Sequence, residues 1–269
     1  MSALELLSRE AAATQVAVMA GGEGKRMGLI GVPKPLITLN GVPLLDRCIR
    51  YLASSGFQEF AVLARHEEVA RRASEVQFGV KVRVCRDPPL PKVGKGKALK
   101  HALETGCLDP GRRVLVAFPD DVFLDGTLPL RFLASHLEAV RRLGVWASVA
   151  VVAGLQLPYG VVEVDALGLA VKFEEKPSLR VYASTGLYIF EPQALKLLSE
   201  VVDMSAPRAV EFENTLLPLL ADRRRLNAFV VPQGAWMSVN TLKELEEAEE
   251  AAREIEKKVP LKESWGTGD

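Results

Sequence analysis

The chain has 269 residues, 48% of them hydrophobic and 25% charged, and its 34 basic side chains balance 34 acidic ones. This length and apolar content suffice for one large domain, or for one domain with a small appendage. A net charge of zero argues against a broad basic surface for nucleic acid. No apolar run approaches the roughly 20 residues of a membrane span, and the N-terminus lacks the apolar core of a signal peptide. We therefore expect a cytoplasmic protein that binds neither nucleic acid nor membranes.

The first half of the chain alternates short apolar runs with helical spacing of apolar residues. Residues 1–14 predict a short amphipathic helix. The predicted strands are Gln15–Ala20, Phe60–Ala64, Val80–Cys85 and Val114–Phe118. The predicted helices are Pro43–Ser55, His66–Val76, Lys97–Thr105 and Leu128–Leu143. Because these strands are almost continuously apolar, the pattern predicts an α/β fold with a mostly parallel sheet and helices on both faces.

The second half of the chain has more strand character. Its predicted strands are Val145–Val152, Gly160–Val164, Leu169–Glu174, Tyr182–Phe190 and Arg225–Val231, with a hairpin-like turn at Asp165–Gly168. Its predicted helices are Pro192–Glu200, Phe212–Leu220 and Thr241–Lys258. The last of these begins with a capping box, in which Thr241 is the N-cap and Glu244 lies three residues on.

Four glycines occupy eight residues, 21–28, directly after the first strand. Glycine there lets backbone N–H groups approach a phosphate closely. Arg26 adds a bidentate fork for phosphate, and Lys34 places a point charge between two prolines. Together these groups suit a triphosphate whose charge grows as pyrophosphate leaves. Ligands of such sheets lie at the carboxyl ends of the strands, where a loop at residues 87–96 and the pair Asp120–Asp121 also fall.

Other nucleotide folds fit the glycine loop less well. Its Gly22, Gly24 and Gly28 match a dinucleotide-binding fingerprint weakly, but a dehydrogenase should have an acidic residue after the second strand. Residues 64–66 at that place read Ala-Arg-His, and no P-loop motif occurs. A basic run in the following loop and helix has two open interpretations, a solvated face or a partial attraction site for the nucleotide: Lys92, Lys95, Lys97 and Lys100.

The cysteines and histidines form no recognisable site. Cys48, Cys85 and Cys107 are widely spaced and match no zinc or redox motif, so we interpret them as three buried or incidental thiols. Nothing in the sequence requires an oxidising compartment. The histidines accompany no nucleophile elbow, and we expect them at the surface: His66, His101 and His136.

Residues 19–28, followed by Pro33–Leu36, resemble the opening motif of the sugar-phosphate nucleotidyltransferases. That family includes the mannose-1-phosphate guanylyltransferases and the glucose-1-phosphate uridylyl- and thymidylyltransferases. The resemblance continues over about 220 residues, in order, at Pro119–Phe123, Pro158–Asp165, Glu174–Pro177, Ser184–Phe190, Phe212–Leu220 and Trp236–Thr241. It implies a Rossmann-like, GT-A-like nucleotidyltransferase fold over residues 15–242, with a nucleotide-binding half at 15–143 and a sugar-binding half at 144–242. Residues 1–14 would then be an N-terminal extension, and residues 243–269 a C-terminal helix and tail.

The resemblance also implies roles for individual residues. Those that would bind the nucleotide are Ala20, Gly21, Gly22, Gly24, Lys25, Arg26, Lys34, Gly94 and Asp120. Those that would contact the sugar phosphate are Gly160, Glu175, Lys176, Ser184 and Thr185. Catalysis would depend on Arg26, Lys34 and Lys176, without a protein nucleophile.

A Mg²⁺ cofactor would be held by Asp120, since Mg²⁺ prefers one or two carboxylates together with phosphate oxygens. Many family members place an Asp two residues after the tryptophan of the second metal motif, where this chain has Ser238. Asn240 lies two residues further on, and its amide oxygen is our choice for the second ligand. Asp121 either shares the metal site or caps the helix that follows.

We therefore expect an enzyme that joins a nucleoside triphosphate to a sugar 1-phosphate and releases pyrophosphate. One alternative is a catalytically silent, nucleotide-binding regulatory subunit of the same fold. Another is a cytidylyltransferase for a non-sugar phosphorylated alcohol such as inositol phosphate or phosphocholine. The sequence identifies neither the base nor the sugar, and it leaves a homo-oligomer open.

Overall fold

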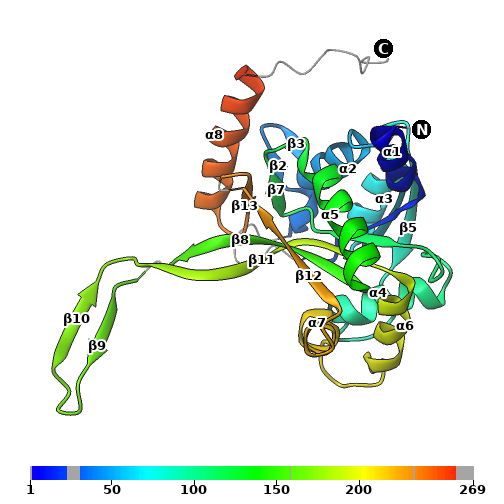
Figure 1. The fold of residues 1–269 in the computed structure, drawn as a ribbon. Coiled ribbons are helices and arrows are strands. Elements are labelled where there is room, and N and C mark those ends of the chain that lie inside the picture. The colour runs from blue at the N-terminus through cyan, green and yellow to red at the C-terminus, as the bar shows by residue number, and fades with distance from the viewer. Residues whose placement is uncertain (1, 23–30, 158, 233, 259–269) are drawn as a thin grey trace.

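The computed structural model describes residues 2–22, 31–157, 159–232 and 234–258 (Figure 1). Three residues assigned above to the triphosphate, Gly24, Lys25 and Arg26, lie outside the described residues. None of the helices in the described part of the chain is long and apolar enough to cross a membrane.

A seven-stranded sheet in the order β12-β8-β11-β6-β1-β4-β5 forms the centre of the fold. The strands of its first half, β1 (Gln15–Met19), β4 (Glu59–Ala64), β5 (Lys81–Arg86) and β6 (Val114–Ala117), run parallel. The second half adds β8 (Ala147–Gln156), β11 (Ser178–Phe190) and β12 (Leu226–Val231), of which β11 is antiparallel to both β6 and β8. The predicted mixed, mostly parallel α/β sheet is confirmed.

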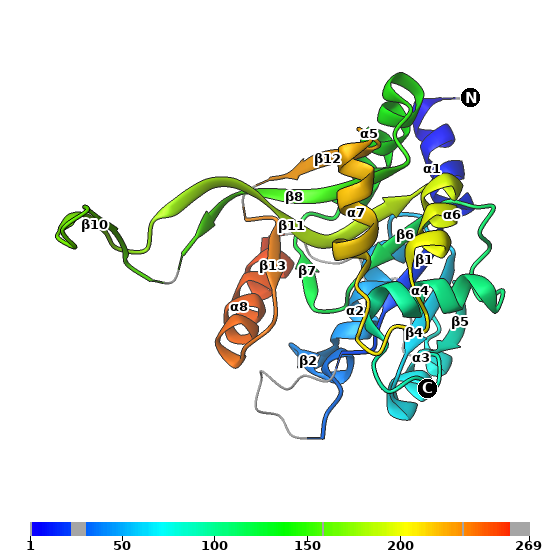
Figure 2. The ribbon, with the colours of Figure 1, turned by 90° about the horizontal axis from the view of Figure 1, so that it is seen from below.

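Helices cover both faces of this sheet, because alternate residues of each strand point to opposite sides. On one face Ala17 and Met19 of β1 pack with α4 (Gly94–Glu104), α6 (Pro192–Val201) and α7 (Phe212–Asp222). On the other face Val16 and Val18 pack with α1 (Ala3–Ala13), α2 (Leu44–Ala53), α3 (Glu67–Glu75) and α5 (Leu128–Leu143). Figure 2 shows the sheet between these layers.

Smaller elements surround the carboxyl edge of the parallel strands. A short 3-10 helix, η2 (Lys34–Leu36), precedes the hairpin of β2 (Thr38–Leu39) and β3 (Val42–Pro43). Two further short strands, β7 (Asp121–Phe123) and β13 (Trp236–Ser238), pair with each other. The long C-terminal helix α8 (Leu242–Lys258) follows β13, and the predicted capping box of Thr241 and Glu244 is present.

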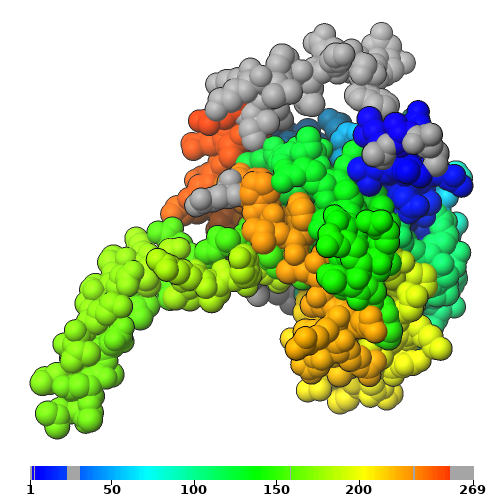
Figure 3. Space-filling model, in the orientation of Figure 1, coloured from blue at the N-terminus to red at the C-terminus, as the bar shows by residue number. Residues whose placement is uncertain are grey.

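Strands β8 and β11 run further than their sequence pattern predicts. Their ladder continues to the pair Gln156–Ser178, and a hairpin of β9 (Val161–Val164) and β10 (Ala170–Glu174) follows beyond it. We call residues 153–182 the arm. It projects away from the rest of the protein in Figure 1, and the space-filling view of Figure 3 shows it without neighbours along most of its length.

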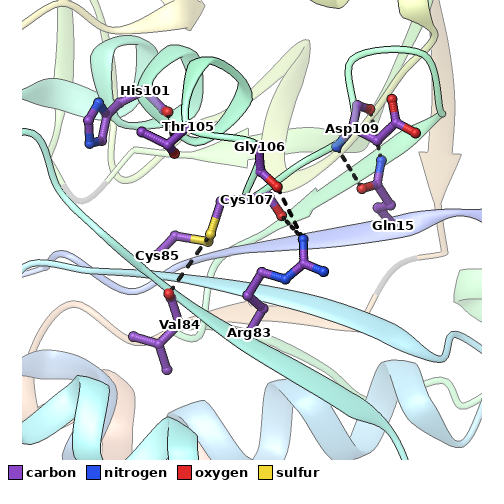
Figure 4. Close-up of a disulfide and its surroundings, with 9 residues drawn as sticks. All are labelled: Gln15, Arg83, Val84, Cys85, His101, Thr105, Gly106, Cys107 and Asp109. Atoms are coloured by element: carbon purple, nitrogen blue, oxygen red, sulfur yellow. Dashed lines mark hydrogen bonds between the residues drawn. A yellow bond between two sulfur atoms is a disulfide. The ribbon is translucent and has the colours of Figure 1, made fainter.

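The prediction of three free thiols is wrong, because Cys85 and Cys107 form a disulfide (Figure 4). Cys85 ends β5 and Cys107 lies in the turn after α4, so their Cα atoms lie 6.1 Å apart despite a separation of 22 residues. This proximity depends on how α4 packs back on the sheet, which spacing alone does not reveal. Cys48 is the free cysteine, and burial raises the pKa of its thiol to about 12.

The prediction of surface histidines is wrong for His136, which is fully buried. Its ring nitrogens lie 2.8 Å from the Ser148 hydroxyl and 2.9 Å from a Glu191 carboxylate oxygen. Arg113 contacts the same Glu191 carboxylate and donates to Glu10 of α1 at 2.8 Å. These partners satisfy the buried imidazole and fasten the N-terminal helix to the sheet.

Candidate active site

A cavity of about 450 Å³ opens at the carboxyl edge of the parallel strands. The predicted site residues that line it come from several separate segments: Gly21, Gly22, Lys34, Gly94, Asp120 and Asn240. Ala20 lies behind the wall, where it is buried and its N–H donates to the Leu63 carbonyl at 2.9 Å. The sheet thus brings together most of the described residues that the sequence assigned to the nucleotide.

Lys34 is the centre of this arrangement. Its Nζ contacts a carboxylate oxygen of Asp120 and donates to Oδ1 of Asn240 at 2.8 Å. Its backbone N–H donates to the Gly22 carbonyl at 3.2 Å, which fixes the lysine beside the glycine loop. Residues separated by 86 and 206 positions in sequence therefore meet at one ammonium group.

The side chain of Asn240 is oriented by its neighbours. Its amide Nδ2 donates to the Ser238 hydroxyl, which leaves Oδ1 directed toward Lys34. Its backbone N–H donates to Glu244 at 2.6 Å, and the same carboxylate oxygen accepts the Thr241 N–H at 2.9 Å. Further along α8, Glu249 accepts the backbone N–H of Asn40, in the β2–β3 hairpin, at 3.0 Å.

Asp120 and Asn240 both reach the same Nζ, so an acidic and an amide oxygen lie within reach of a single cation. This is the type of ligand pair that Mg²⁺ accepts when phosphates and water complete its shell. Within the described residues, no group of three or more His, Cys, Asp and Glu side chains is arranged to hold a metal. A metal here would therefore depend on substrate oxygens for the rest of its coordination.

Asp121 does not cap the following helix, which was one of its two predicted roles. Helix α5 begins at Leu128 with Thr127 as N-cap, and β7 begins at Asp121 itself. The Asp121 carboxylate accepts from Trp236 Nε1 at 2.7 Å and packs against Gly186. Burial, together with the neighbouring Asp120, raises the pKa of Asp121 to about 7.

Helix α4 begins at Gly94, three residues earlier than predicted, and its first turn borders the cavity. Gly94 has a φ of +74°, and a Cβ there would lie 2.6 Å from backbone atoms of Val210. Only glycine fits this combination of left-handed backbone and close approach. The position is therefore set by packing of the 210 segment on α4, which the sequence pattern did not reveal.

The four lysines of this basic run differ in their surroundings, and two of them, Lys97 and Lys100, fit neither interpretation. Lys97 is buried, and its Nζ donates to the Ala206 carbonyl at 2.6 Å. Lys100 donates to the carbonyls of Ser199 and Val202 at 2.6 and 2.8 Å. Both lysines therefore connect α4 to the end of α6 and the segment that follows it. Lys95 does line the cavity, but Glu211 and Glu213 already pair with its charge.

Two cavity residues, Arg65 and Asp87, were not singled out from the sequence. They directly follow β4 and β5, and this position after consecutive strands was the available signal. Burial raises the pKa of Asp87, and the nearby Arg65 opposes that shift. The lining also includes the apolar residues Met19, Leu63, Val93, Ala98 and Phe118, so the cavity has both polar and apolar walls.

The residues predicted for the sugar phosphate are divided between two places. Thr185 is buried in the body and donates to the Ala150 carbonyl at 3.0 Å, with the exposed Ser184 beside it. Gly160, Glu175 and Lys176 lie on the arm, where they are exposed and do not line the cavity of their own chain. Gly160 and Glu175 are neighbours, since a Cβ on Gly160 would lie 3.0 Å from Glu175 Oε2.

Comparison with known proteins adds independent information on this arrangement. A model of the nucleotidyl transferase family matches residues 15–255. The glucose-1-phosphate thymidylyltransferase of Mycolicibacterium smegmatis is 27% identical over 259 residues, covering 91% of this chain and 84% of that protein. The mannose-1-phosphate guanyltransferase of Pichia angusta is 26% identical over 238 residues, covering 84% of this chain but only 61% of that protein.

A solved structure from Bacillus anthracis, assigned as a glucose-1-phosphate thymidylyltransferase in complex with sucrose, superimposes with a TM-score of 0.67. The superposition covers 90% of this chain and 96% of the other chain, and the two sequences are 21% identical. This similarity is evidence for a shared fold. The family model spans the whole sheet, the cavity and most of α8. The chain belongs to the nucleotidyl transferase family.

Proposed function

We propose that this protein transfers a nucleoside monophosphate from a nucleoside triphosphate to a sugar 1-phosphate, with release of pyrophosphate. The observation that carries the proposal is the meeting of Lys34, Asp120 and Asn240 in the lining of the cavity, together with Gly21 and Gly22. The relatives named for glucose 1-phosphate and mannose 1-phosphate support the sugar phosphate as acceptor.

The reaction is an in-line attack by an oxygen of the sugar phosphate on the α-phosphorus of the nucleotide. The attacking group is already an anion, so the protein supplies positioning and charge neutralisation rather than a nucleophile or base. We assign Lys34 to the triphosphate, and its position at the start of η2, in the lining of the cavity, supports this assignment. We assign Arg26 of the glycine loop to the negative charge of the triphosphate, and Lys176 to the phosphate of the sugar 1-phosphate.

We assign Mg²⁺ to Asp120 and Asn240, with Ser238 orienting the Asn240 amide. Bound there, the ion would neutralise charge that develops on the α-phosphate and the leaving pyrophosphate. The ammonium of Lys34 contacts the same two oxygens. Lys34 would therefore turn from Asp120 toward the triphosphate when nucleotide and metal bind.

The test is pyrophosphate release with Mg²⁺, five nucleoside triphosphates and a panel of sugar 1-phosphates, with inositol phosphate and phosphocholine included. Asp120→Asn should reduce the rate by about 10²-fold or more, whereas Asp222→Asn, at the exposed end of α7, should leave it unchanged. Binding of Mn²⁺ as a spin probe should weaken in the Asp120 variant alone. Nucleotide binding without release from any pair would favour the silent regulatory subunit.

A further inference from the structure

The lining of the cavity contains a carboxylate, Asp87, that the proposed reaction does not use. Burial raises the pKa of this half-buried side chain, and the charges of Arg65, His101 and His66 oppose that shift. In the part of the chain that the structure describes, no group donates a hydrogen bond to the Asp87 carboxylate. A carboxylate that loses water without gaining a donor has unsatisfied acceptors. Asp87 therefore offers hydrogen-bond acceptors to the occupant of the cavity.

Two consecutive glycines connect Asp87 with the Lys34 group. A Cβ on Gly21 would lie 3.5 Å from Asp87 Oδ2, and a Cβ on Gly22 would lie 3.7 Å from Lys34 Cβ. Asp87 directly follows β5 and Asp120 follows β6, and strands β1 and β4 lie between these two. Three strand spacings separate the strand ends by about 14 Å. The cavity thus has two separate polar places, one at Lys34 and Asp120 for the triphosphate and one at Asp87 for the base, with the ribose between them.

The five common bases differ in what their Watson–Crick edges present to a carboxylate. Guanine has two adjacent donors, N1–H and the N2 amine, which match the two oxygens of a carboxylate. Adenine and cytosine present one amine beside a ring nitrogen that carries a lone pair. Uracil and thymine present one N–H between two carbonyl oxygens. An ionised carboxylate has no proton to donate, so it repels these acceptors and fits guanine alone in both of its oxygens.

We propose that Asp87 selects guanine, so that GTP is the nucleoside triphosphate that this protein uses. This inference rests on the proposed function for the reaction, whereas the choice of base follows from the cavity. Arg65 lines the same cavity, and a guanidinium is the usual donor to O6 and N7 of guanine. The apolar residues of the lining supply the contact area that a flat purine needs: Met19, Leu63, Val93, Ala98 and Phe118.

The first test is equilibrium binding of nucleoside triphosphates to the whole chain, with Mg²⁺ and without a sugar phosphate. GTP should bind more tightly than ATP, CTP, UTP and dTTP. Inosine triphosphate lacks only the N2 amine, and the loss of one hydrogen bond to a charged acceptor should weaken its binding about 10- to 100-fold relative to GTP. Tighter binding of any other base, or equal binding of the guanosine and inosine nucleotides, would overturn the assignment of Asp87.

The second test is Asp87→Asn. The amide replaces one acceptor with a donor, which opposes the N2 amine of guanine and matches the C2 carbonyl of xanthine. The variant should bind GTP about 10- to 100-fold more weakly than the wild type does, and it should bind xanthosine triphosphate more tightly than the wild type does. Asp222→Asn makes the same change at the exposed end of α7 and should keep the wild-type preferences.

The gain for xanthosine triphosphate separates base recognition from a general effect on folding, because a damaged cavity would not gain affinity for any nucleotide. Weaker binding of both purine nucleotides by a variant with the wild-type melting temperature would contradict the proposed contact. Failure of the reaction itself gives a different result. GTP binding without pyrophosphate release from any sugar 1-phosphate would contradict the proposed function and leave the base choice intact. Release that is fastest with another nucleotide would do the reverse.

Discussion

The disulfide between Cys85 and Cys107 should contribute measurably to stability. It closes a loop with a separation of 22 residues, and the chain-entropy model gives about 3.4 kcal/mol at 25 °C for such a loop. For a domain of this size, about 2 to 4 °C of melting temperature corresponds to 1 kcal/mol. Reduction should therefore lower the melting temperature by about 7 to 14 °C.

The measurement is thermal unfolding by circular dichroism, with and without reductant, after a thiol count. The chain has three cysteines in total, so one free thiol is expected in the denatured, unreduced protein and three after reduction. The double variant Cys85→Ala with Cys107→Ala should melt near the reduced wild type. Cys48→Ala serves as the control, because it retains the disulfide and should still respond to reductant.

One competing explanation would make the disulfide thermally silent. Arg83 donates to the carbonyls of Gly106 and Cys107, each at 3.2 Å (Figure 4), and Cys85 is buried in the core. If these contacts alone hold the turn, the oxidised and reduced proteins will melt together. Equal melting temperatures, together with the expected thiol counts, would refute the argument that the disulfide stabilises the protein by restricting the unfolded chain.

Three further predictions concern the site and the core. Gly186→Ala should lower the free energy of unfolding in urea by about 3 kcal/mol, because its Cβ would lie 1.8 Å from an Asp121 oxygen; an unchanged midpoint would contradict this packing. Burial holds the pKa of His136 below its ordinary 6.5, so the unfolded chain takes up a proton that the folded one does not. Stability is then retained above pH 6.5 and lost as pH falls below it, and His136→Gln should flatten that part of the melting-temperature profile relative to wild type. Lys34→Met should reduce kcat/KM for the nucleotide by about 10²-fold, whereas Lys81→Met, at an exposed position, should have no effect.

The first half of the fold was predictable because its signals are local. The predicted strands β1, β4, β5 and β6 agree with the observed bounds to within a residue, and α5 agrees at both ends. Continuous apolar runs indicate buried strands, and helical spacing of apolar residues indicates amphipathic helices, and both patterns can be recognised in short windows of sequence. The same property explains why the motifs identified Gly21, Gly22, Lys34 and Asp120, which all line the cavity.

What the sequence did not reveal depends on contacts between distant residues. The first residues of β11 are exposed even though they include Leu179, Val181 and Tyr182, and they form a strand because β8 pairs with them. His136 is buried because Ser148 and Glu191 satisfy its nitrogens. The motif that includes Lys176 likewise gives no sign that this residue is exposed on the arm.

Helix α8 gives the C-terminal end of the chain a mechanical role. Through Glu244 it holds the backbone of Asn240, and through Glu249 it holds Asn40 in the hairpin that follows Lys34. Helix α8 therefore connects two segments that are far apart in sequence. A chain shortened before Leu242 would retain every residue that we assign to chemistry, yet it would lose the brace that sets their spacing. The residues that position the candidate site therefore extend further along the chain than the residues that form it.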